Sequence, residues 1–372
     1  MKTKKSSKQQ GWAARKLRGT KDWFWTHRYR LRKIFLIGLA VWLVFYAQVW
    51  LVSNWYINKH HKEPLTFGVT FIPEYVRYFG LDSHQTLLAF RDDMGIKRFR
   101  LVSFWNEIEP HPGQYDFSEL DWEMDAVQAV GGQMSLSIGL RQPRWPECHQ
   151  PDWAVDLSVQ QRNDSVNNFL RAVVNHVKSR AGLKDYQLEN EYFLSVFGIC
   201  PYPERQQLIS EFKLVKSLDP KRPIIMSLAN NYFGIPTGQP RADQFGVSVY
   251  KRVWDQTVTH RYFEYPFSPR YYAWRAGLTE MFTGKSSMLH ELQAEPWPPK
   301  GVGLKDASIA EQNKSMDAPR LKARVQYAID TGFRDIDFWG AEWWYWRKEV
   351  KHDPSLWNVI KDELRRVQAT HP

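Results

Sequence analysis

The fold of this chain is decided by a stretch in its middle, where QMSLSIGL (residues 133–140) and KDYQLEN (184–190) flank SVNNFLRAVVNHVKSR (165–180). The two flanking runs have the length and apolar pattern of strands, and the segment between them repeats apolar residues at helical spacing. A strand, a helix and a second strand in this order form a unit whose strands pair in parallel. The stretch therefore predicts one β–α–β unit.

The same alternation extends in both directions from this unit. An open doubly wound sheet would usually bring a glycine-rich phosphate turn after its first strand, and FGVTFIPEYV (67–76) contains none. Eight strands with their helices over about 300 residues instead match a closed barrel. We therefore expect an α/β chain with a (β/α)8 TIM barrel. The six further strand-like runs begin near Thr66, Lys97, Pro223, Gln244, Ser286 and Phe333, and helical spacing recurs at 205–218 and 318–331.

The net positive charge of the chain is confined to its N-terminus. Residues 1–33 carry twelve Lys and Arg side chains against Asp22, which accounts for the net charge of +11 of all 372 residues. The remaining residues hold 39 basic and 39 acidic side chains. A nucleic-acid-binding protein needs its positive charge on the folded surface that meets phosphates. We therefore expect no nucleic-acid partner.

An apolar stretch follows the basic one, IFLIGLAVWLVFYAQVWLV (34–52), in which Gln48 is the only strongly polar residue. About 20 apolar residues cross a bilayer as a helix, because every backbone polar group is then satisfied internally. A cleavable signal peptide is the competing interpretation, but its apolar region is shorter and no small-residue cleavage pattern follows Val52. The pattern favours an uncleaved transmembrane helix that contacts the lipid bilayer through residues 34–52.

The order of basic and apolar segments also predicts a topology. By the positive-inside rule, residues 1–33 are a basic cytoplasmic tail and the chain after the helix lies across the membrane. We therefore expect a single-pass membrane protein with a linker at 53–64 and the barrel domain, residues 65–370, outside the cytoplasm.

The two cysteines lie in loops that the barrel brings together. Cys148 is in RQPRWPECH (141–149), after the third strand, and Cys200 is in GICP (198–201), after the fourth. Loops that follow adjacent strands lie side by side, and disulfides persist outside the cytoplasm. We therefore predict a Cys148–Cys200 disulfide.

Two carboxylates close strand-like runs, Glu191 in QLENEY (187–192) and Glu291 in MLHELQ (288–293). The chemistry of a (β/α)8 barrel lies at the C-terminal ends of its strands. Hydrolysis of a glycoside needs two carboxyl groups, one as acid and one as nucleophile or base. Strict alternation would turn Glu189 and Glu191 away from Asn190, so a bulge or the strand end must re-aim these side chains.

Asn190-Glu191 ending strand four, with Glu291 ending strand seven, resembles glycoside hydrolase clan A, the retaining (β/α)8 families. QLENEY is similar to the corresponding stretch of family 35 β-galactosidases, and LHELQAEPW (289–297) is similar in placement to the nucleophile strand of families 42 and 5. WNEIEPHPGQYDF (105–117) resembles the W-x-x-x-E-P-x-x-G-x-Y-D-F signature common in this clan. The resemblance covers about residues 66–345.

The resemblance implies a role for each of these residues. Glu191 would be the acid/base, Glu291 the nucleophile, and Asn190 would hold the sugar hydroxyl next to the reacting carbon. Tyr250 and Trp339, at the ends of strands six and eight, fall where clan members place a Tyr that contacts the nucleophile and a Trp that stacks on the sugar.

The two carboxyls need different environments. Partial burial and the charge of its partner would raise the pKa of Glu191 and keep it protonated. A nearby Arg would keep Glu291 ionised, and we expect Arg100 in this place, with Arg98 as the alternative because both have the same orientation on their strand. Glu295 is the rival nucleophile, less favoured because it lies in the loop beyond the apolar run.

Other residues are candidates for substrate binding. Glu342, after strand eight, binds substrate or is simply a loop charge. Aromatic rings stack on the C–H faces of sugars, although large aromatics also fill cores. His149 and His290 lack a third ligand at a recognisable spacing, so we expect no metal and no cofactor. The Trp candidates are Trp105, Trp145, Trp297, Trp339, Trp343 and Trp344, of which Trp339 and Trp105 are placed in the site.

The sequence therefore predicts a membrane-anchored retaining β-glycosidase that hydrolyses O-glycosidic bonds of an extracytoplasmic oligo- or polysaccharide by double displacement. Retention predicts carboxyl groups about 5–5.5 Å apart, and inversion about 6.5–9.5 Å. Two alternatives stay open, a membrane-tethered, catalytically inactive glycan-binding barrel and an anchored scaffold. The sequence does not select a sugar, a linkage, or exo or endo action.

Overall fold

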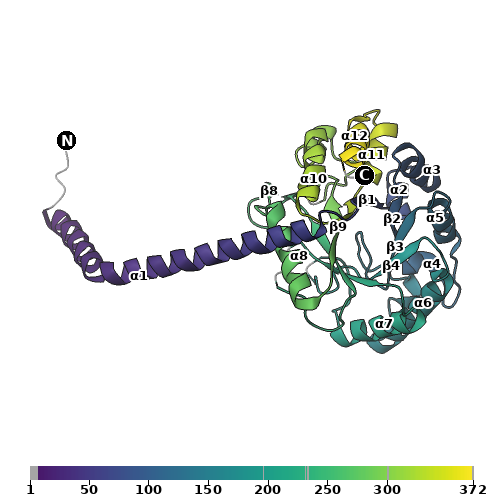
Figure 1. Cartoon of the computed structure of the whole chain (residues 1–372), viewed down its shortest axis with the longest axis horizontal. Coiled ribbons are helices and arrows are strands. Elements are labelled where there is room, and N and C mark those ends of the chain that lie inside the picture. Colours follow the sequence, from purple (N-terminus) through teal and green to yellow (C-terminus); the bar gives the residue numbers. More distant parts are fainter. Residues whose placement is uncertain (1–6, 196, 231, 233, 300, 371–372) are drawn as a thin grey trace. The chain divides into compact units, whose positions relative to one another are not determined.

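A computed structural model describes residues 7–195, 197–230, 232, 234–299 and 301–370 of the chain (Figure 1). It divides the chain into two compact units, with the boundary between Val52 and Ser53. The first six residues of the predicted tail lie outside the described residues.

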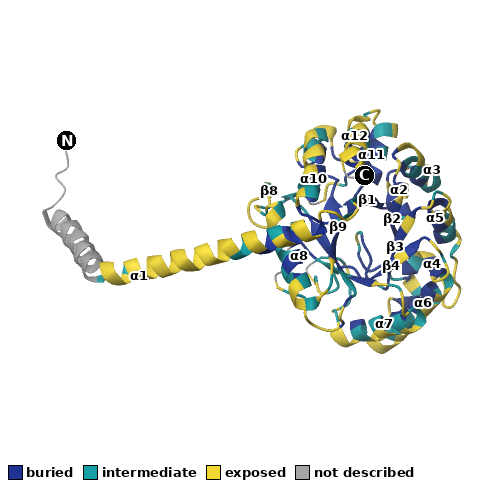
Figure 2. Ribbon diagram, viewed as in Figure 1, coloured by how far each residue is buried: buried dark blue, intermediate teal, exposed yellow. Residues whose placement is uncertain are grey.

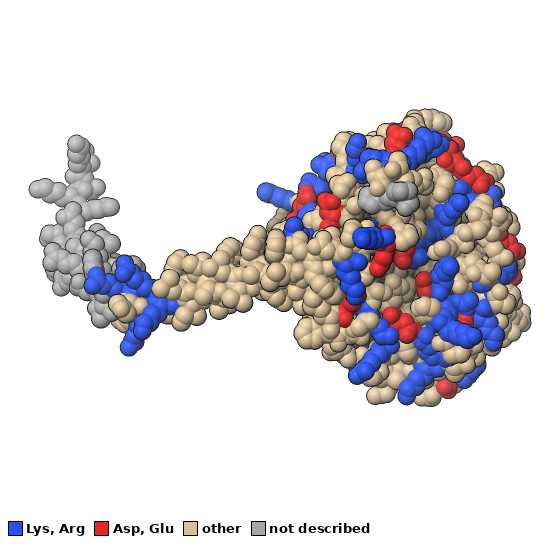
Figure 3. Space-filling model, in the orientation of Figure 1, with Lys and Arg blue, Asp and Glu red and all other residues tan. Residues whose placement is uncertain are grey.

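One long helix, α1 (Ser7–His60), contains the apolar stretch. Within it, His27–His60 holds a segment long and apolar enough to cross a membrane. Its apolar side chains are exposed, among them Phe35 at 69% and Val44 at 70%. Residues 34–52 contain no Lys, Arg, Asp or Glu, and the space-filling view shows the corresponding shaft of the helix without charged atoms (Figure 3). The predicted long apolar helix is thus confirmed as one that could span a membrane.

The segment predicted as a linker, 53–64, is helical over residues 53–60, because α1 continues to His60. Tyr56 is buried, and its ring packs edge-on against Phe333 with centroids 6.0 Å apart. His60 Nε2 lies 2.8 Å from Glu280 Oε2. These contacts hold the last turns of the helix as part of the barrel unit, so no flexible spacer begins at residue 53.

Eight parallel strands close the barrel, and each starts within two residues of a predicted position. Around the barrel the order is β1-β10-β9-β6-β5-β4-β3-β2, so neighbouring strands are joined by crossovers. The predicted (β/α)8 barrel is confirmed. The strands are β1 (Thr66–Thr70), β2 (Arg98–Val102), β3 (Gln133–Ile138), β4 (Leu183–Leu188), β5 (Ile224–Leu228), β6 (Gln244–Val249), β9 (Ser287–Gln293) and β10 (Asp335–Trp339).

Helices surround this ring of strands (Figure 1). Between β5 and β6 the described residues form no helix, whereas a hairpin of β7 (Arg252–Trp254) and β8 (Tyr262–Glu264) follows β6. The helices are α2 (Pro73–Tyr78), α3 (Ser83–Leu88), α4 (Trp105–Ile108), α5 (Ser118–Gln128), α6 (Val159–Val177), α7 (Arg205–Leu218), α8 (Pro269–Thr283), α9 (Ile309–Asn313), α10 (Ala318–Asp330), α11 (Glu342–Glu349) and α12 (Ser355–Thr370), with a π-turn at Ala89–Asp93 and a 3-10 turn at Asp152–Ala154.

Burial follows the layers of the barrel. The strands are buried and the outer faces of the helices are exposed (Figure 2). Inside the barrel, Arg98 Nε lies 2.8 Å from Asp337 Oδ1, and Gly68 leaves room for both because a Cβ there would collide with them. Arg98 therefore neutralises Asp337 in the barrel interior, and the alternative in which it contacts Glu291 does not hold.

Candidate active site

An open cleft lies at the C-terminal ends of the strands. It has a volume of about 710 Å³ and is lined by residues that follow β3, β4, β5 and β6 and by residues at the ends of β9 and β10. This is the end of a (β/α)8 barrel at which catalytic residues are found. Of the predicted site residues, the cleft brings together Asn190, Glu191, Tyr250, Glu291 and Trp339.

Glu291 is held by one cation and one hydroxyl. Arg100 Nη1 donates to Glu291 Oε1 at 2.9 Å, and the Tyr250 hydroxyl donates to Oε2 at 2.8 Å. Burial of the phenol and the charge of Glu291 raise the pKa of Tyr250 well above its usual value, so Tyr250 remains a donor. Both oxygens of Glu291 thus accept hydrogen bonds, one of them from a positively charged guanidinium.

Arg100 also links Glu291 to the end of β4. Its guanidinium is fully buried, with Nε 2.7 Å from Gln187 Oε1 and Nη2 3.2 Å from Asn190 Oδ1. The planar fork of Arg binds several acceptors at fixed angles, which a Lys could not do. Arg100 therefore sets the position of Glu291 relative to Asn190.

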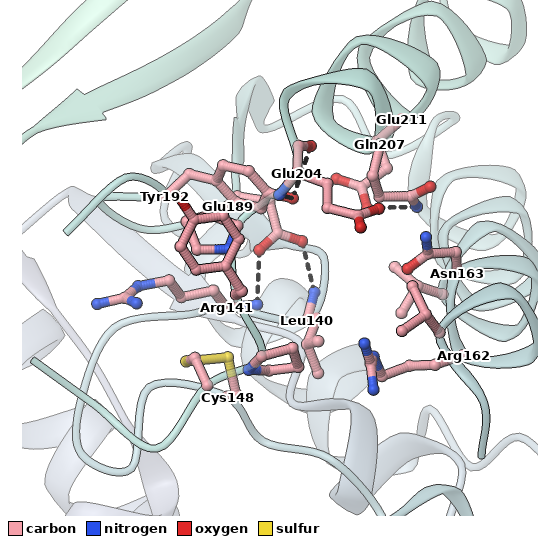
Figure 4. Close-up of a pocket in the computed structure, with 16 residues that line it drawn as sticks. Leu140, Arg141, Cys148, Arg162, Asn163, Glu189, Tyr192, Glu204, Gln207 and Glu211 are labelled. Atoms are coloured by element: carbon pink, nitrogen blue, oxygen red, sulfur yellow. Dashed lines mark hydrogen bonds between the residues drawn. A yellow bond between two sulfur atoms is a disulfide. The ribbon is translucent and has the colours of Figure 1, made fainter. Parts of the chain in front are cut away.

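The end of β4 re-aims the side chains that follow it. The strand ends at Leu188, and Glu189 and Glu191 adopt left-handed backbone angles, with φ of 54° and 40°. Glu189 turns into a smaller pocket beside α7, where its carboxylate accepts from the backbone N–H groups of Leu140 and Arg141 at 2.7 Å each (Figure 4). Asn190 and Glu191 line the cleft instead, as the predicted irregularity at the strand end requires.

Glu191 has the surroundings of a carboxylic acid. Burial, the negative charge of Glu291 and the charge of Glu147 raise its pKa to about 8. One hydrogen bond opposes this rise, from the Ser248 hydroxyl to Glu191 Oε1 at 2.7 Å. Near neutral pH the carboxyl therefore carries its proton, while Glu291 sits beside a guanidinium.

Glu295 lines the same cleft with both oxygens engaged. Arg144 Nη1 donates to Oε1 at 2.7 Å and the Tyr75 hydroxyl to Oε2 at 2.7 Å. The Arg144 guanidinium also lies over the Trp339 ring, 4.2 Å from its centroid. Glu295 thus neutralises Arg144 and holds the wall of the cleft beside Trp339.

Glu147 is a cleft residue that the sequence did not single out. It is 4% exposed, and its Oε2 accepts from Asn190 Nδ2 at 2.9 Å. Burial raises its pKa to about 7. The sequence feature that could have identified Glu147 is its position in a loop after β3, next to Cys148.

The loop of Glu147 is tied to the loop after β4. Cys148 and Cys200 form a disulfide with their Cα atoms 5.3 Å apart, which confirms the prediction. Gly198 lies so close to Glu147 that a Cβ would approach the Glu147 Cβ to 2.8 Å. The two loops therefore pack closely against each other at Gly198 and Glu147.

Aromatic rings continue the cleft outward from Tyr250. Neighbouring centroids are 5.4 Å apart for Tyr250–Trp297, 6.2 Å for Trp297–Phe197 and 5.7 Å for Phe197–Trp145. All four line the cleft, and Trp145 is exposed at its rim. Such a row suits stacking on sugar rings, and it contains two of the predicted Trp candidates.

Trp105 and Glu342, which were predicted to bind substrate, are not among the described residues that line the cleft. Trp105 is fully buried and donates from Nε1 to Glu109 Oε2 at 2.6 Å. Glu342 is fully buried and accepts from the Ile72 backbone N–H at 2.9 Å. The candidates Trp343 and Trp344 are fully buried as well.

No family model matches this sequence, and no curated protein matches it. Solved structures do match. The GH5_18 protein from Streptomyces cattleya, solved in complex with GlcNAc, has a TM-score of 0.57 and 12% identity, over 83% of this chain and 82% of that one. The exo-β-1,4-mannosidase from Opitutaceae bacterium strain TAV5 has a TM-score of 0.54 and 15% identity, over 82% of this chain and 60% of that one.

A further structure of the Streptomyces cattleya protein, a Glu-to-Ala variant in complex with Manβ1-4GlcNAc, matches with a TM-score of 0.53 and 14% identity, over 74% of this chain and 71% of that one. At these identities the likeness is one of fold. These neighbours are glycoside hydrolases of the clan A type, and this chain shares their TIM-barrel fold. Its cleft lies at the end of the barrel where such folds carry their chemistry.

Proposed function

We propose that this protein is a membrane-anchored retaining β-glycosidase with Glu191 as acid/base and Glu291 as nucleophile. One observation carries the proposal. Two carboxyls line the same cleft in opposite electrostatic surroundings, Glu191 with a pKa raised to about 8 and Glu291 against Arg100. Two carboxyls in such different surroundings suit the roles of acid and nucleophile in the hydrolysis of a glycoside.

The first chemical step uses both residues. Glu291 attacks the anomeric carbon and its C–O bond to the sugar forms, while the bond to the leaving oxygen breaks and Glu191 donates its proton to that oxygen. Arg100 and Tyr250 fix the two oxygens of Glu291 for this attack. The product of the step is a glycosyl ester on Glu291.

The second step follows from the change of charge. Formation of the ester removes the negative charge of Glu291, which is a main cause of the raised pKa of Glu191. The pKa of Glu191 therefore falls, and its carboxylate accepts a proton from the water that attacks the ester. Net retention of configuration results.

The anchoring belongs to the same proposal. The apolar segment of α1 spans the bilayer, residues 1–33 lie in the cytoplasm, and the barrel lies on the extracytoplasmic side, where it meets an oligo- or polysaccharide. The proposal is supported by the length and apolar character of His27–His60 and by the basic residues before it.

The test uses the full-length chain in detergent with a panel of 4-nitrophenyl α- and β-glycosides. We expect hydrolysis of β-glycosides with retention, read by NMR of the first-formed product, and a loss of about 10³-fold or more in Glu291→Ala. Glu349→Gln, an exposed carboxyl on α11, is the matched control. Glycan binding without turnover by the wild-type chain would point instead to the inactive glycan-binding barrel, and full activity of Glu291→Ala would overturn the proposal.

A further inference from the structure

Carboxylates outnumber cations in the cleft. Five acidic residues line it, Glu147, Glu191, Asp255, Glu291 and Glu295, and among the described lining residues Arg144 is the one basic side chain. The chain after residue 33 has equal numbers of acidic and basic residues. The acidic excess is therefore local to the cleft and favours a substrate with positive charge.

Not every one of these acids is available to a ligand. Arg100 pairs with Glu291, Arg144 pairs with Glu295, and Glu191 holds a proton near neutral pH. Glu147 remains deep in the cleft, and Asp255 remains on the hairpin loop, where its oxygens accept from Thr257 and Thr259. Glu147 is thus the buried carboxyl that the proposed reaction does not use. Burial raises its pKa to about 7, and a cation beside it would favour its ionised form.

One oxygen of Glu147 is unpartnered. Oε2 accepts from Asn190 Nδ2 at 2.9 Å and lies 3.7 Å from Arg141 Nε, and Oε1 makes no hydrogen bond with any residue that the structure describes. The side chain is held in place by a turn in which its N–H donates to the Arg144 carbonyl at 2.7 Å. A residue 4% exposed with an unpaired oxygen in a cleft is prepared for a donor from a ligand.

The contacts also locate Glu147 relative to the reacting carbon. Glu291 contacts Arg100, Arg100 contacts Asn190, and Asn190 contacts Glu147. Tyr250 contacts the other oxygen of Glu291 with its hydroxyl. The two ring atoms bonded to the anomeric carbon are the ring oxygen, which only accepts hydrogen bonds, and C2, whose substituent can donate one. An acceptor such as Glu147 therefore suits the substituent on C2.

We propose that the cleft recognises a β-glycoside whose C2 carries a free ammonium group, and that Glu147 is the residue that pairs with it. This inference rests on the proposed function, since it assumes that the anomeric carbon faces Glu291. An ammonium group on C2 donates a hydrogen bond to Glu147 Oε1 and also neutralises the charge of the carboxylate. A neutral hydroxyl donates the hydrogen bond but leaves the charge in place. The substrate class is thus a glycan of 2-amino-2-deoxy sugars.

The experiment compares three tetrasaccharides with the same β-1,4-gluco backbone that differ only at C2. They are cellotetraose with a hydroxyl, the glucosamine tetramer with an amine, and its N-acetylated form. Binding to the full-length chain in detergent is measured by isothermal titration near neutral pH, in a Glu191→Gln background that stops turnover. We expect the glucosamine tetramer to bind about 10- to 100-fold more tightly than cellotetraose, as for a hydrogen bond to a charged group.

The variant Glu147→Gln, added to the same background, should bring the two dissociation constants within about threefold of each other. Glu349→Gln should leave their ratio as it was. Cellotetraose binding in the same variant reports that the cleft is intact. The proposal is overturned if the glucosamine tetramer does not bind, if it binds no more tightly than cellotetraose, or if its advantage survives Glu147→Gln.

The two proposals fail separately. Hydrolysis of aryl glycosides that depends on Glu291, without a preference for the amine, would remove only the substrate class. Preferential binding of the glucosamine tetramer that depends on Glu147, without hydrolysis of any glycoside by the wild-type chain, would remove only the catalytic proposal.

Discussion

The hydroxyl of Ser248 donates a hydrogen bond of 2.7 Å to Oε1 of Glu191. Ser248 is also the strand partner of Glu291, because β6 and β9 pair at these two residues. One small side chain thus contacts the proposed acid and lies beside the proposed nucleophile. Any shift of β6 against β9 would change the separation of the two carboxyls.

The raised pKa of Glu191 predicts the pH dependence of the reaction. For a phenyl glycoside, which needs a proton on its leaving oxygen, kcat/KM should fall as pH rises through about 8, because Glu191 loses its proton there. Ser248→Ala removes a contact that lowers this pKa, so the alkaline limb should move to higher pH. Ser217→Ala, on the exposed face of α7, should leave it in place. A limb in Ser248→Ala that stays or moves to lower pH would contradict this assignment.

Glu295 and Glu291 should respond differently to the same substitution. Both oxygens of Glu295 are bound, by Arg144 and Tyr75, so Glu295→Gln should act mainly on binding and raise KM by about tenfold with kcat within tenfold. Glu291→Gln should lower kcat by about 10³-fold or more. Steady-state kinetics of both variants measures this, with thermal unfolding as a check on folding. The reverse order would make Glu295 the nucleophile.

The packing of Tyr56 predicts where the barrel unit begins. A chain of residues 53–372 keeps the contact of Tyr56 with Phe333, whereas a chain of 65–372 loses it. The shorter chain should be less stable by about 3–5 kcal/mol, as for removal of a buried aromatic side chain. Urea unfolding of the two chains measures the difference, and Tyr56→Ala in the longer chain should reproduce most of it. Equal urea midpoints for the two chains would indicate that residues 53–64 are a linker that does not stabilise the barrel.

The disulfide should contribute to stability through the unfolded state. Cys148 and Cys200 are 52 residues apart, and closing a loop of this length stabilises the fold by about 4 kcal/mol in the chain-entropy model. The double variant Cys148→Ser, Cys200→Ser should lose that amount in urea unfolding, and the wild-type chain after reduction should match it. A loss below about 0.5 kcal/mol would show that the loops are held without the bond.

The strands were predictable because each one presents a short apolar run, in most cases between helical segments, and strand position then determines which loops meet. That is why the pairing of Cys148 with Cys200 and the contact of Arg100 with Glu291 followed from the sequence. The sequence showed that the side chains around Asn190 must be re-aimed at the end of the strand, but it did not show how. The observed orientation depends on left-handed backbone angles at Glu189 and Glu191, which no side-chain pattern encodes.

The errors have a common cause. Whether a Trp or Glu that follows a strand reaches the cleft depends on the packing of the whole segment, and Trp105 and Glu342 are fully buried outside the lining of the cleft. Glu147 is the opposite case: it was not predicted, because it lies in an irregular turn, yet it lines the cleft. The end of α1 was missed because its burial depends on Phe333, far away in the sequence.

The central claim is that Glu291 forms a covalent bond with the sugar. A 2-deoxy-2-fluoro glycoside with a dinitrophenyl leaving group, matched to the sugar preferred in the aryl panel, slows release of the intermediate, and peptide mass spectrometry then locates the label. Our account predicts one fluoroglycosyl group per chain, on the peptide that contains Glu291 and on that carboxylate. A label on Glu295, or an active enzyme that inverts configuration and never becomes labelled, would contradict it.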